Sequence, residues 1–191
     1  MSPEAPLERT EHGLLPAGDG WFVLNARDAE WRIWGGQKYP RLEGATPRFE
    51  HLGLGLTVLE PGEPMSAYHW ETDQESFLIL AGEAIAIVEG EERPLRQWDL
   101  VHCPPGASHV IVGAGDEPCV VFAVGAREHH TYRKPDGTIE GRDDWGAYTV
   151  DDAARRHGAC GDEETKDPAV AYADWPERVT TRYRAGWLPD L

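Results

Sequence analysis

The chain has 191 residues, of which 40% are apolar and 27% are charged. This length and apolar content are enough for one sizeable hydrophobic core, and no second globular unit of full size is expected beside it. The formal net charge of −16 argues against nucleic acid or an anionic membrane surface as partner, because contacts to phosphate need clustered Lys and Arg side chains.

Membrane insertion is not expected either. Residues 1–10 lack the apolar run of a secretory leader, and no stretch approaches the ~20 apolar residues of a membrane-spanning helix. We therefore expect a cytoplasmic location. The cysteines, Cys103, Cys119 and Cys160, have neither a CxxC spacing nor the density of a disulfide framework, so reduced thiols are expected.

Residues 1–48 are predicted to form an amino-terminal arm with an aromatic strand segment. The first part, to about Gly20, is polar and rich in turn-forming residues. Two aromatic-rich runs follow, at residues 21–25 and 31–34, and both are expected to be strands. Gly35 and its neighbour Gly36 end the second run.

Residues 49–126 are predicted to form the core of the domain, because short apolar runs alternate there with turn-forming residues. The runs cover residues 51–59, 68–71, 75–80, 83–88, 93–98, 100–103, 109–112 and 118–124. Such a succession of short strands predicts an all-β fold, as an antiparallel barrel or jelly roll or as an immunoglobulin-like sandwich. Periodicity alone does not separate these architectures.

Residues 127–191 are predicted to be an extension that packs on the barrel or on a partner subunit. The segment is charged and irregular, and two short helices are expected at residues 151–157 and 167–174. Each begins with Asp as a possible cap, and proline occupies the first turn of the second helix. Apolar anchors for the extension are Trp175, Tyr183 and Trp187.

Histidines and carboxylates in the core strands are of the types that bind a divalent metal ion. His69 and Glu71 stand two residues apart, so their side chains point to the same face of one strand. In the next strand, alternation places Glu75 on the same face as Phe77. Without a cation, the two carboxylates would repel one another and one of them would take up a proton, whereas a bound ion would neutralise both.

At these residues the sequence resembles the cupin superfamily. The first motif of that family places Gly, His-x-His, Glu and Gly in succession. Here it is matched by Gly62, His69, Glu75 and Gly82, with Glu71 standing where the second histidine is usual. The resemblance implies that the fold is a single cupin jelly-roll barrel.

The second cupin motif is matched further along the chain. Asp99 is followed by Pro104, Gly106 and His109 at the family's spacing, with Gly113 in place of the usual Asn. The resemblance also implies a homodimer.

The resemblance implies that His69, Glu75 and His109 hold a divalent metal ion, with Glu71 as a further ligand. Iron, manganese, nickel and zinc are all compatible with such a donor set. A second interpretation stays open, in which there is no metal and a protonated His69 pairs with Glu71 or Glu75 in a hydrogen-bonded cluster.

Two functions follow from this site. One is a metal-dependent enzyme, dioxygenase-like or isomerase-like, that acts on a small oxygen-bearing molecule. The other is a non-catalytic barrel, with or without metal, that binds or senses a small molecule. A fold alone does not select between them, and the sequence specifies neither the substrate nor the native metal.

Further residues have two interpretations each. Cys103 is expected to be a buried inert thiol, with a role as thiolate ligand or redox centre as the alternative, and alternation sends His102 to the opposite face. Gln74 either orients a ligand or ends a turn. His129 and His130 are expected to be solvated, with an additional ligand or a pH-sensitive contact as the alternatives.

Overall fold

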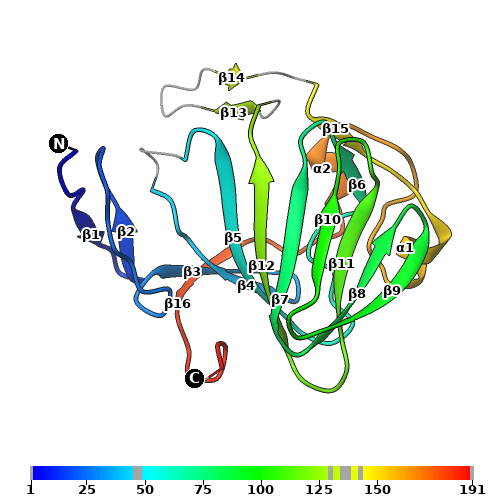
Figure 1. Cartoon of the computed structure of the whole chain (residues 1–191), viewed down its shortest axis with the longest axis horizontal. Coiled ribbons are helices and arrows are strands. Elements are labelled where there is room, and N and C mark those ends of the chain that lie inside the picture. The colour runs from blue at the N-terminus through cyan, green and yellow to red at the C-terminus, as the bar shows by residue number, and fades with distance from the viewer. Residues whose placement is uncertain (1, 45–48, 129–130, 134–138, 142–143, 190–191) are drawn as a thin grey trace.

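Two packed β-sheets make up most of the protein in the computed structural model (Figure 1). The structure describes residues 2–44, 49–128, 131–133, 139–141 and 144–189. The predicted all-β fold, with few and short helices, is confirmed.

The strands pair in antiparallel fashion within two large sheets. The larger sheet has the order β10 (Leu100–Cys103), β7 (Glu75–Ala81), β12 (Cys119–Ala126), β5 (Leu52–Leu59), β4 (Gln37–Pro40), β3 (Glu30–Trp34) and β16 (Val179–Arg182). The smaller sheet has the order β15 (Gly146–Tyr148), β6 (His69–Glu71), β11 (His109–Ala114), β8 (Glu83–Val88) and β9 (Glu91–Arg96).

The remaining elements are short. Two hairpins consist of β1 (Leu7–Arg9) with β2 (Leu14–Pro16), and of β13 (Thr131–Arg133) with β14 (Ile139–Gly141). The helices are α1 (Asp152–Arg156) and α2 (Pro168–Ala171). The β1–β2 hairpin and the β8–β9 hairpin lie at opposite ends of the molecule (Figure 1). No helix in the described part of the chain is long and apolar enough to cross a membrane.

Side-chain alternation decides which residues enter the space between the large sheets. On β11, Ile111 belongs to the central hydrophobic cluster together with Phe77 of β7, whereas Val110 and Val112 lie in a separate cluster on the outer face. Burial of apolar surface is the main favourable contribution to folding, so this register is strongly preferred over its one-residue shift. The same register turns His109, two residues before Ile111, to the inside.

The outer face of the smaller sheet is covered by α1. Ala153 and Ala154 of this helix pack in one cluster with Val110 and Ile87. The Asp151 carboxylate caps the helix by accepting the backbone N–H groups of Ala153 at 2.7 Å and Ala154 at 3.3 Å. The predicted helix and its cap are confirmed here, whereas the helix predicted at residues 167–174 is shorter and ends at Ala171.

The outer face of the larger sheet is covered by the end of the chain. Trp31, Val58 and Val120 form a buried cluster there, and the aromatic side chains of Tyr183 and Trp187 pack against it. The extension thus contacts the outer faces of both sheets.

The strands predicted between residues 51 and 124 are confirmed as β5 to β12, but the strand predicted at residues 21–25 is wrong. Of that run, only Trp21 makes an isolated bridge, to Glu4, and the side chain of Val23 is 77% exposed. Asn25 begins a turn instead, because its Oδ1 accepts the Arg27 N–H at 2.9 Å. An aromatic-rich run needs a neighbouring strand to become one, and the fold supplies none there.

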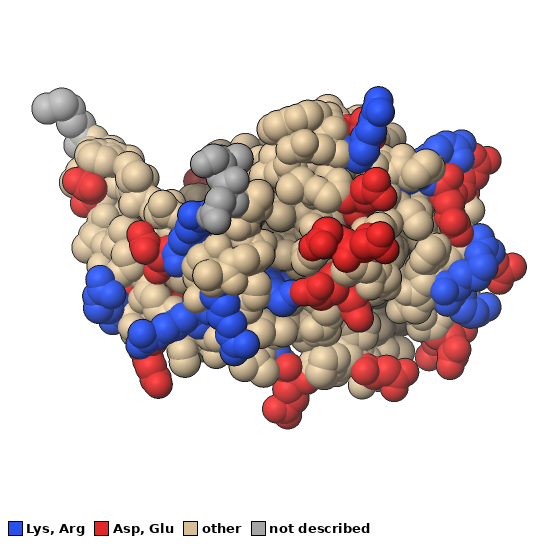
Figure 2. All heavy atoms as spheres, turned by 90° about the horizontal axis from the view of Figure 1, so that it is seen from below, with Lys and Arg blue, Asp and Glu red and all other residues tan. Residues whose placement is uncertain are grey.

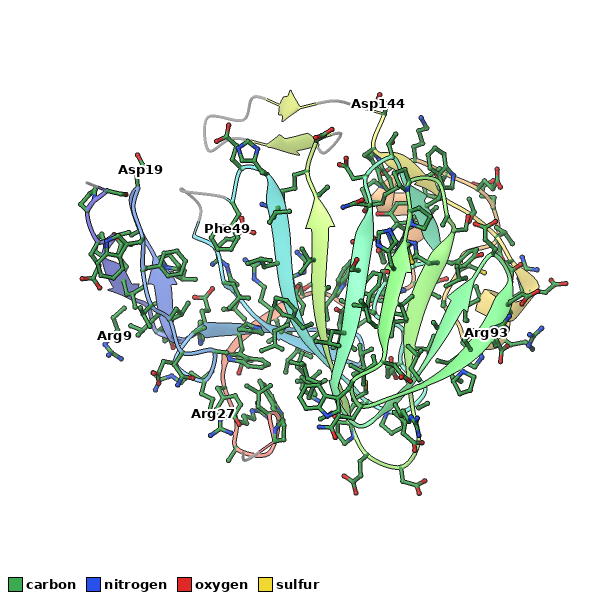
Figure 3. All side chains as sticks on the ribbon, viewed as in Figure 1. Arg9, Asp19, Arg27, Phe49, Arg93 and Asp144 are labelled. Carbon is green, nitrogen blue, oxygen red and sulfur yellow. The ribbon has the colours of Figure 1, made fainter. Side chains whose placement is uncertain are left out.

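Charged side chains of both signs share the molecular surface. On the face drawn in Figure 2, acidic and basic side chains are interspersed with uncharged surface. This face therefore carries no uniform basic surface of the kind that binds a phosphate backbone.

Candidate metal centre

The site residues come from both sheets and meet in the space between them. His69 on β6 and His109 on β11 are directly opposite one another in the register of the smaller sheet. Glu75 lies at the start of β7, in the larger sheet. Glu71 ends β6, two residues after His69 and on the same face. The structure thus brings together all four residues selected from the sequence.

Three of the four side chains form a compact group. His69, Glu75 and His109 each offer one ligand atom, and these atoms all lie within 4.8 Å of one another. The Glu75 Oε2 atom is 2.9 Å from His109 Nε2 and 3.6 Å from His69 Nε2. Glu71 joins the group from the side of His69, with its Oε1 3.5 Å from His69 Nε2.

Backbone carbonyls orient both imidazole rings. His69 Nδ1 lies 2.7 Å from the Ala67 carbonyl oxygen, and His109 Nδ1 lies 2.9 Å from that of Ala107. A carbonyl oxygen only accepts, so each Nδ1 carries a proton and donates. The Nε2 atoms, which in the neutral rings hold the lone pairs, therefore both face Glu75. Metal-binding histidines are typically held in this way.

The carboxylates and imidazoles also shift one another's protonation. Burial lowers the pKa of His69, but hydrogen bonds to Glu71 and Glu75 outweigh this effect and raise it to about 9. Burial likewise lowers the pKa of His109, whereas hydrogen bonds to Cys103 and Glu75 raise it well above the usual value. Burial raises the pKa of Glu75, yet its bonds to the two histidines hold it well below its ordinary range. In the absence of a metal ion, the group is a buried set of ion pairs at neutral pH.

The cluster lines a pocket with a volume of about 240 Å³. Its other walls are apolar or aromatic for the most part, and they include Phe77 and Ile111 from the two sheets. The extension forms one side of the pocket. Trp145 lies directly before β15, Tyr148 ends β15, and Tyr172 follows α2. The sequence analysis missed these three aromatic residues.

A signal for these residues is present in the sequence, as aromatic side chains within an otherwise charged segment. The aromatic anchors predicted in the extension lie elsewhere: Trp175 packs at a tilt against Trp34, and Tyr183 and Trp187 pack on Trp31.

A second hollow of about 210 Å³ adjoins the carboxylates from the other side. Glu71 and Glu75 line both hollows, and Gly125 of β12 makes room for Glu75, since a Cβ there would lie 3.2 Å from its Oε1. Arg127 also lines this hollow, but its guanidinium donates two hydrogen bonds to the Glu43 carboxylate. Nη1 lies 2.9 Å from Oε2, and Nη2 lies 2.8 Å from Oε1.

The structure places most of the residues for which the sequence allowed two interpretations. Cys103 is buried and hydrogen-bonded to His109, whereas His102 is exposed and bonds to Ser76, as alternation predicts. All three cysteines are free thiols. Gln74 is exposed, and His129–His130 lie outside the described residues.

Two sheets that enclose a buried cluster of histidine and glutamate side chains define the class of small β-barrel known as the jelly roll. A family model described as "Cupin domain" matches residues 55–125. Among solved structures, a sugar phosphate isomerase from the cupin superfamily of Silicibacter pomeroyi is 22% identical, covers 63% of this chain and 93% of its own, and superposes with a TM-score of 0.50. An RmlC-like cupin of Shewanella frigidimarina is 18% identical over 56% of this chain and 91% of its own, with a TM-score of 0.48.

A curated relative matches as well. Gentisate 1,2 dioxygenase 1 of Aquipseudomonas alcaligenes is 29% identical over 107 residues, which are 56% of this chain. The chain spans 30% of the length of that relative. The chain thus matches a cupin domain over residues 55–125, and it shares its fold with the cupin of Silicibacter pomeroyi.

Proposed function

We propose that the protein is a metal-dependent enzyme of the dioxygenase-like kind, which acts on a small oxygen-bearing molecule in the pocket beside His69. The observation that carries this proposal is the convergence of His69 Nε2, His109 Nε2 and a Glu75 carboxylate oxygen on one point of the pocket wall. Two histidines and one carboxylate with open positions are the donor set of non-haem iron oxygenases.

The residues have separate tasks in this proposal. His69, His109 and Glu75 would hold the ion, and Glu71 would be a fourth ligand or accept a proton from the substrate. A bound divalent ion would supply Lewis-acid chemistry toward a substrate oxygen. Ala67 and Ala107 keep the rings aligned through their carbonyl oxygens, as the 2.7 and 2.9 Å contacts to Nδ1 support. The apolar walls exclude water from the reacting groups.

Iron is the first metal to test, ahead of manganese, nickel and zinc. The donor set supports this order, and so does the resemblance to gentisate 1,2 dioxygenase over 107 residues. A dioxygenase needs a redox-active metal, which zinc is not. The expected partner is a small molecule, and a homodimer and a cytoplasmic location stay predictions.

One observation favours a different function, a metal-free barrel that binds a small molecule. His109 Nε2 and Glu75 Oε2 are already 2.9 Å apart, so the positive imidazolium and the negative carboxylate neutralise one another without a metal ion. A self-compensated cluster of this kind could serve the fold and orient a ligand without turnover.

Metal content separates the two functions. Untagged protein purified without chelator is analysed for transition metals, beside His109→Ala and a control variant, His51→Ala, whose side chain is 87% exposed and lines neither hollow at the cluster. We expect near-stoichiometric metal in the wild type and the control, and its loss in His109→Ala.

A wild type that stays free of metal even after loading with each divalent ion would overturn the enzyme proposal and favour the metal-free barrel. With the metal identified, consumption of dioxygen is measured with gentisate and with other small hydroxylated acids. The metal-loaded His51→Ala protein is the positive control, and the His109→Ala protein is the negative control.

A further inference from the structure

Two tyrosines from the extension line the pocket beside the cluster. Tyr148 belongs to β15, and its ring packs on His69 with 5.9 Å between the ring centroids. Tyr172 follows α2 and packs edge-on against Tyr148, with ring centroids 5.3 Å apart. Both residues line the pocket, and both lie beyond the matched cupin domain, which ends at residue 125.

When the hydrogen bonds of these two hydroxyl groups are counted, one hydroxyl proton has no acceptor among the described residues. Tyr148 and Tyr172 carry two hydroxyl protons, and at most one of them can serve a hydrogen bond between the two neighbouring hydroxyls. The Tyr172 oxygen also accepts the Ala67 N–H at 3.3 Å, and a backbone N–H takes no proton in return. In the described part of the chain, no acceptor is seen for the second hydroxyl proton. A partly buried donor of this kind needs an acceptor, and the pocket is where one can be placed.

The volume and the other lining residues of the pocket limit which molecules can bind there. Its volume of about 240 Å³ exceeds the roughly 150 Å³ that hold a benzene-sized molecule, so one six-membered ring with small substituents fits. Trp145, Tyr148 and Phe77 offer ring faces and edges for stacking. Among the described residues that line it, there is no Lys or Arg to balance a phosphate group next to Glu71 and Glu75.

We propose that the Tyr148–Tyr172 pair recognises the substrate by donating one hydrogen bond to its oxygen, and that the substrate is a single aromatic ring with a hydroxyl or carbonyl oxygen and no phosphate. This inference rests on the proposed function in one respect, because it takes the pocket beside the cluster as the substrate site. The extension then determines specificity while the cupin domain supplies the metal ligands.

A matched pair of probes isolates the hydrogen bond. Acetophenone and α-methylstyrene have the same shape and differ in a carbonyl oxygen against a methylene group. Their dissociation constants are measured by calorimetry for the wild type, for Tyr148→Phe/Tyr172→Phe and for Tyr183→Phe. Tyr183 is a matched control, since its hydroxyl also accepts one backbone N–H, from Leu188 at 3.4 Å, but in the cluster around Trp31.

We expect the wild type and the Tyr183→Phe control to prefer acetophenone, and the double variant to lose about ten-fold of that preference, as befits one hydrogen bond. Because both rings are kept, binding of α-methylstyrene should not change. If the double variant does not fold, Tyr172→Phe alone carries the same comparison.

An unchanged preference in the double variant would overturn the proposal. So would a wild type that binds neither probe, or one that binds ribose 5-phosphate more tightly than acetophenone. The measurement is made on metal-free and metal-loaded protein, with metal content determined separately. A wild type without metal therefore counts against the proposed enzyme alone, and a lost carbonyl preference in the double variant still supports the tyrosine pair.

Discussion

Uptake of a metal ion by this protein should release two protons. In the metal-free cluster both imidazoles are charged at pH 7, because Glu75 and Glu71 hold the pKa of His69 at about 9 and Glu75 helps to raise that of His109. A metal ion binds only the neutral imidazole, so it must displace a proton from each ring. The apparent affinity therefore rises with pH, and the rise ends only as pH passes the pKa values of the metal-free protein.

The magnitude follows from the proton count. Each displaced proton changes the apparent affinity about ten-fold per pH unit, so two protons give about 100-fold per unit and about 10⁴-fold between pH 6 and 8. The increase should flatten from about pH 9, where His69 becomes neutral without help. Glu75 adds nothing to this slope, since its lowered pKa leaves the carboxylate ionised throughout the range.

Competition with a chromophoric chelator, corrected for the chelator's own protons, measures this slope, and calorimetry in two buffers of different ionisation enthalpy counts the protons directly. Glu75→Gln is the informative variant, because it removes the partner of both histidines and should lower the slope together with the affinity. A wild-type release of fewer than one proton per ion would refute the reasoning, since it would mean that the histidines are neutral before the metal arrives.

Three stability predictions test the packing around the site. Ile87→Ala should lower the free energy of unfolding by about 2–5 kcal/mol in urea titrations, because this fully buried side chain joins the smaller sheet to α1; a loss under 1 kcal/mol would contradict the packing described. Asp151→Ala should cost about 0.5–2 kcal/mol through loss of the helix cap, whereas Asp152→Ala, with its side chain 93% exposed, should cost clearly less. Gly146→Ala should loosen β15 from β6, since a Cβ there would overlap the Trp70 carbonyl oxygen and φ is +149°, whereas Gly161→Ala, in open space, should be neutral. Hydrogen exchange of the β6 amides distinguishes the last two variants, and equal protection in both would count against the role of β15.

Much of the core could be predicted because its information is local. Alternating apolar residues with turns between them predict strands, and β5 to β12 lie where the pattern places them. Asp151 predicts a helix start because the cap bonds to amides two and three residues away. The run at residues 21–25 failed for the opposite reason, since strand formation depends on a neighbour that the sequence does not reveal.

The same distinction between local and tertiary information applies to the candidate site. His69 and Glu71 share a face because a strand repeats every two residues, which the sequence alone determines. Their nearness to His109 depends on the pairing of β6 with β11, and their nearness to Glu75 depends on the two sheets facing each other. The resemblance to the cupin family supplied that information. The approach of Tyr148 and Tyr172 was decided only by the tertiary structure, because it results from the extension crossing the sheet edge as β15, far from β6 in the chain. A pairing between segments some 75 residues apart leaves no periodic trace in either segment, whereas His69, Glu71 and Glu75 stand within seven residues of one another in the sequence.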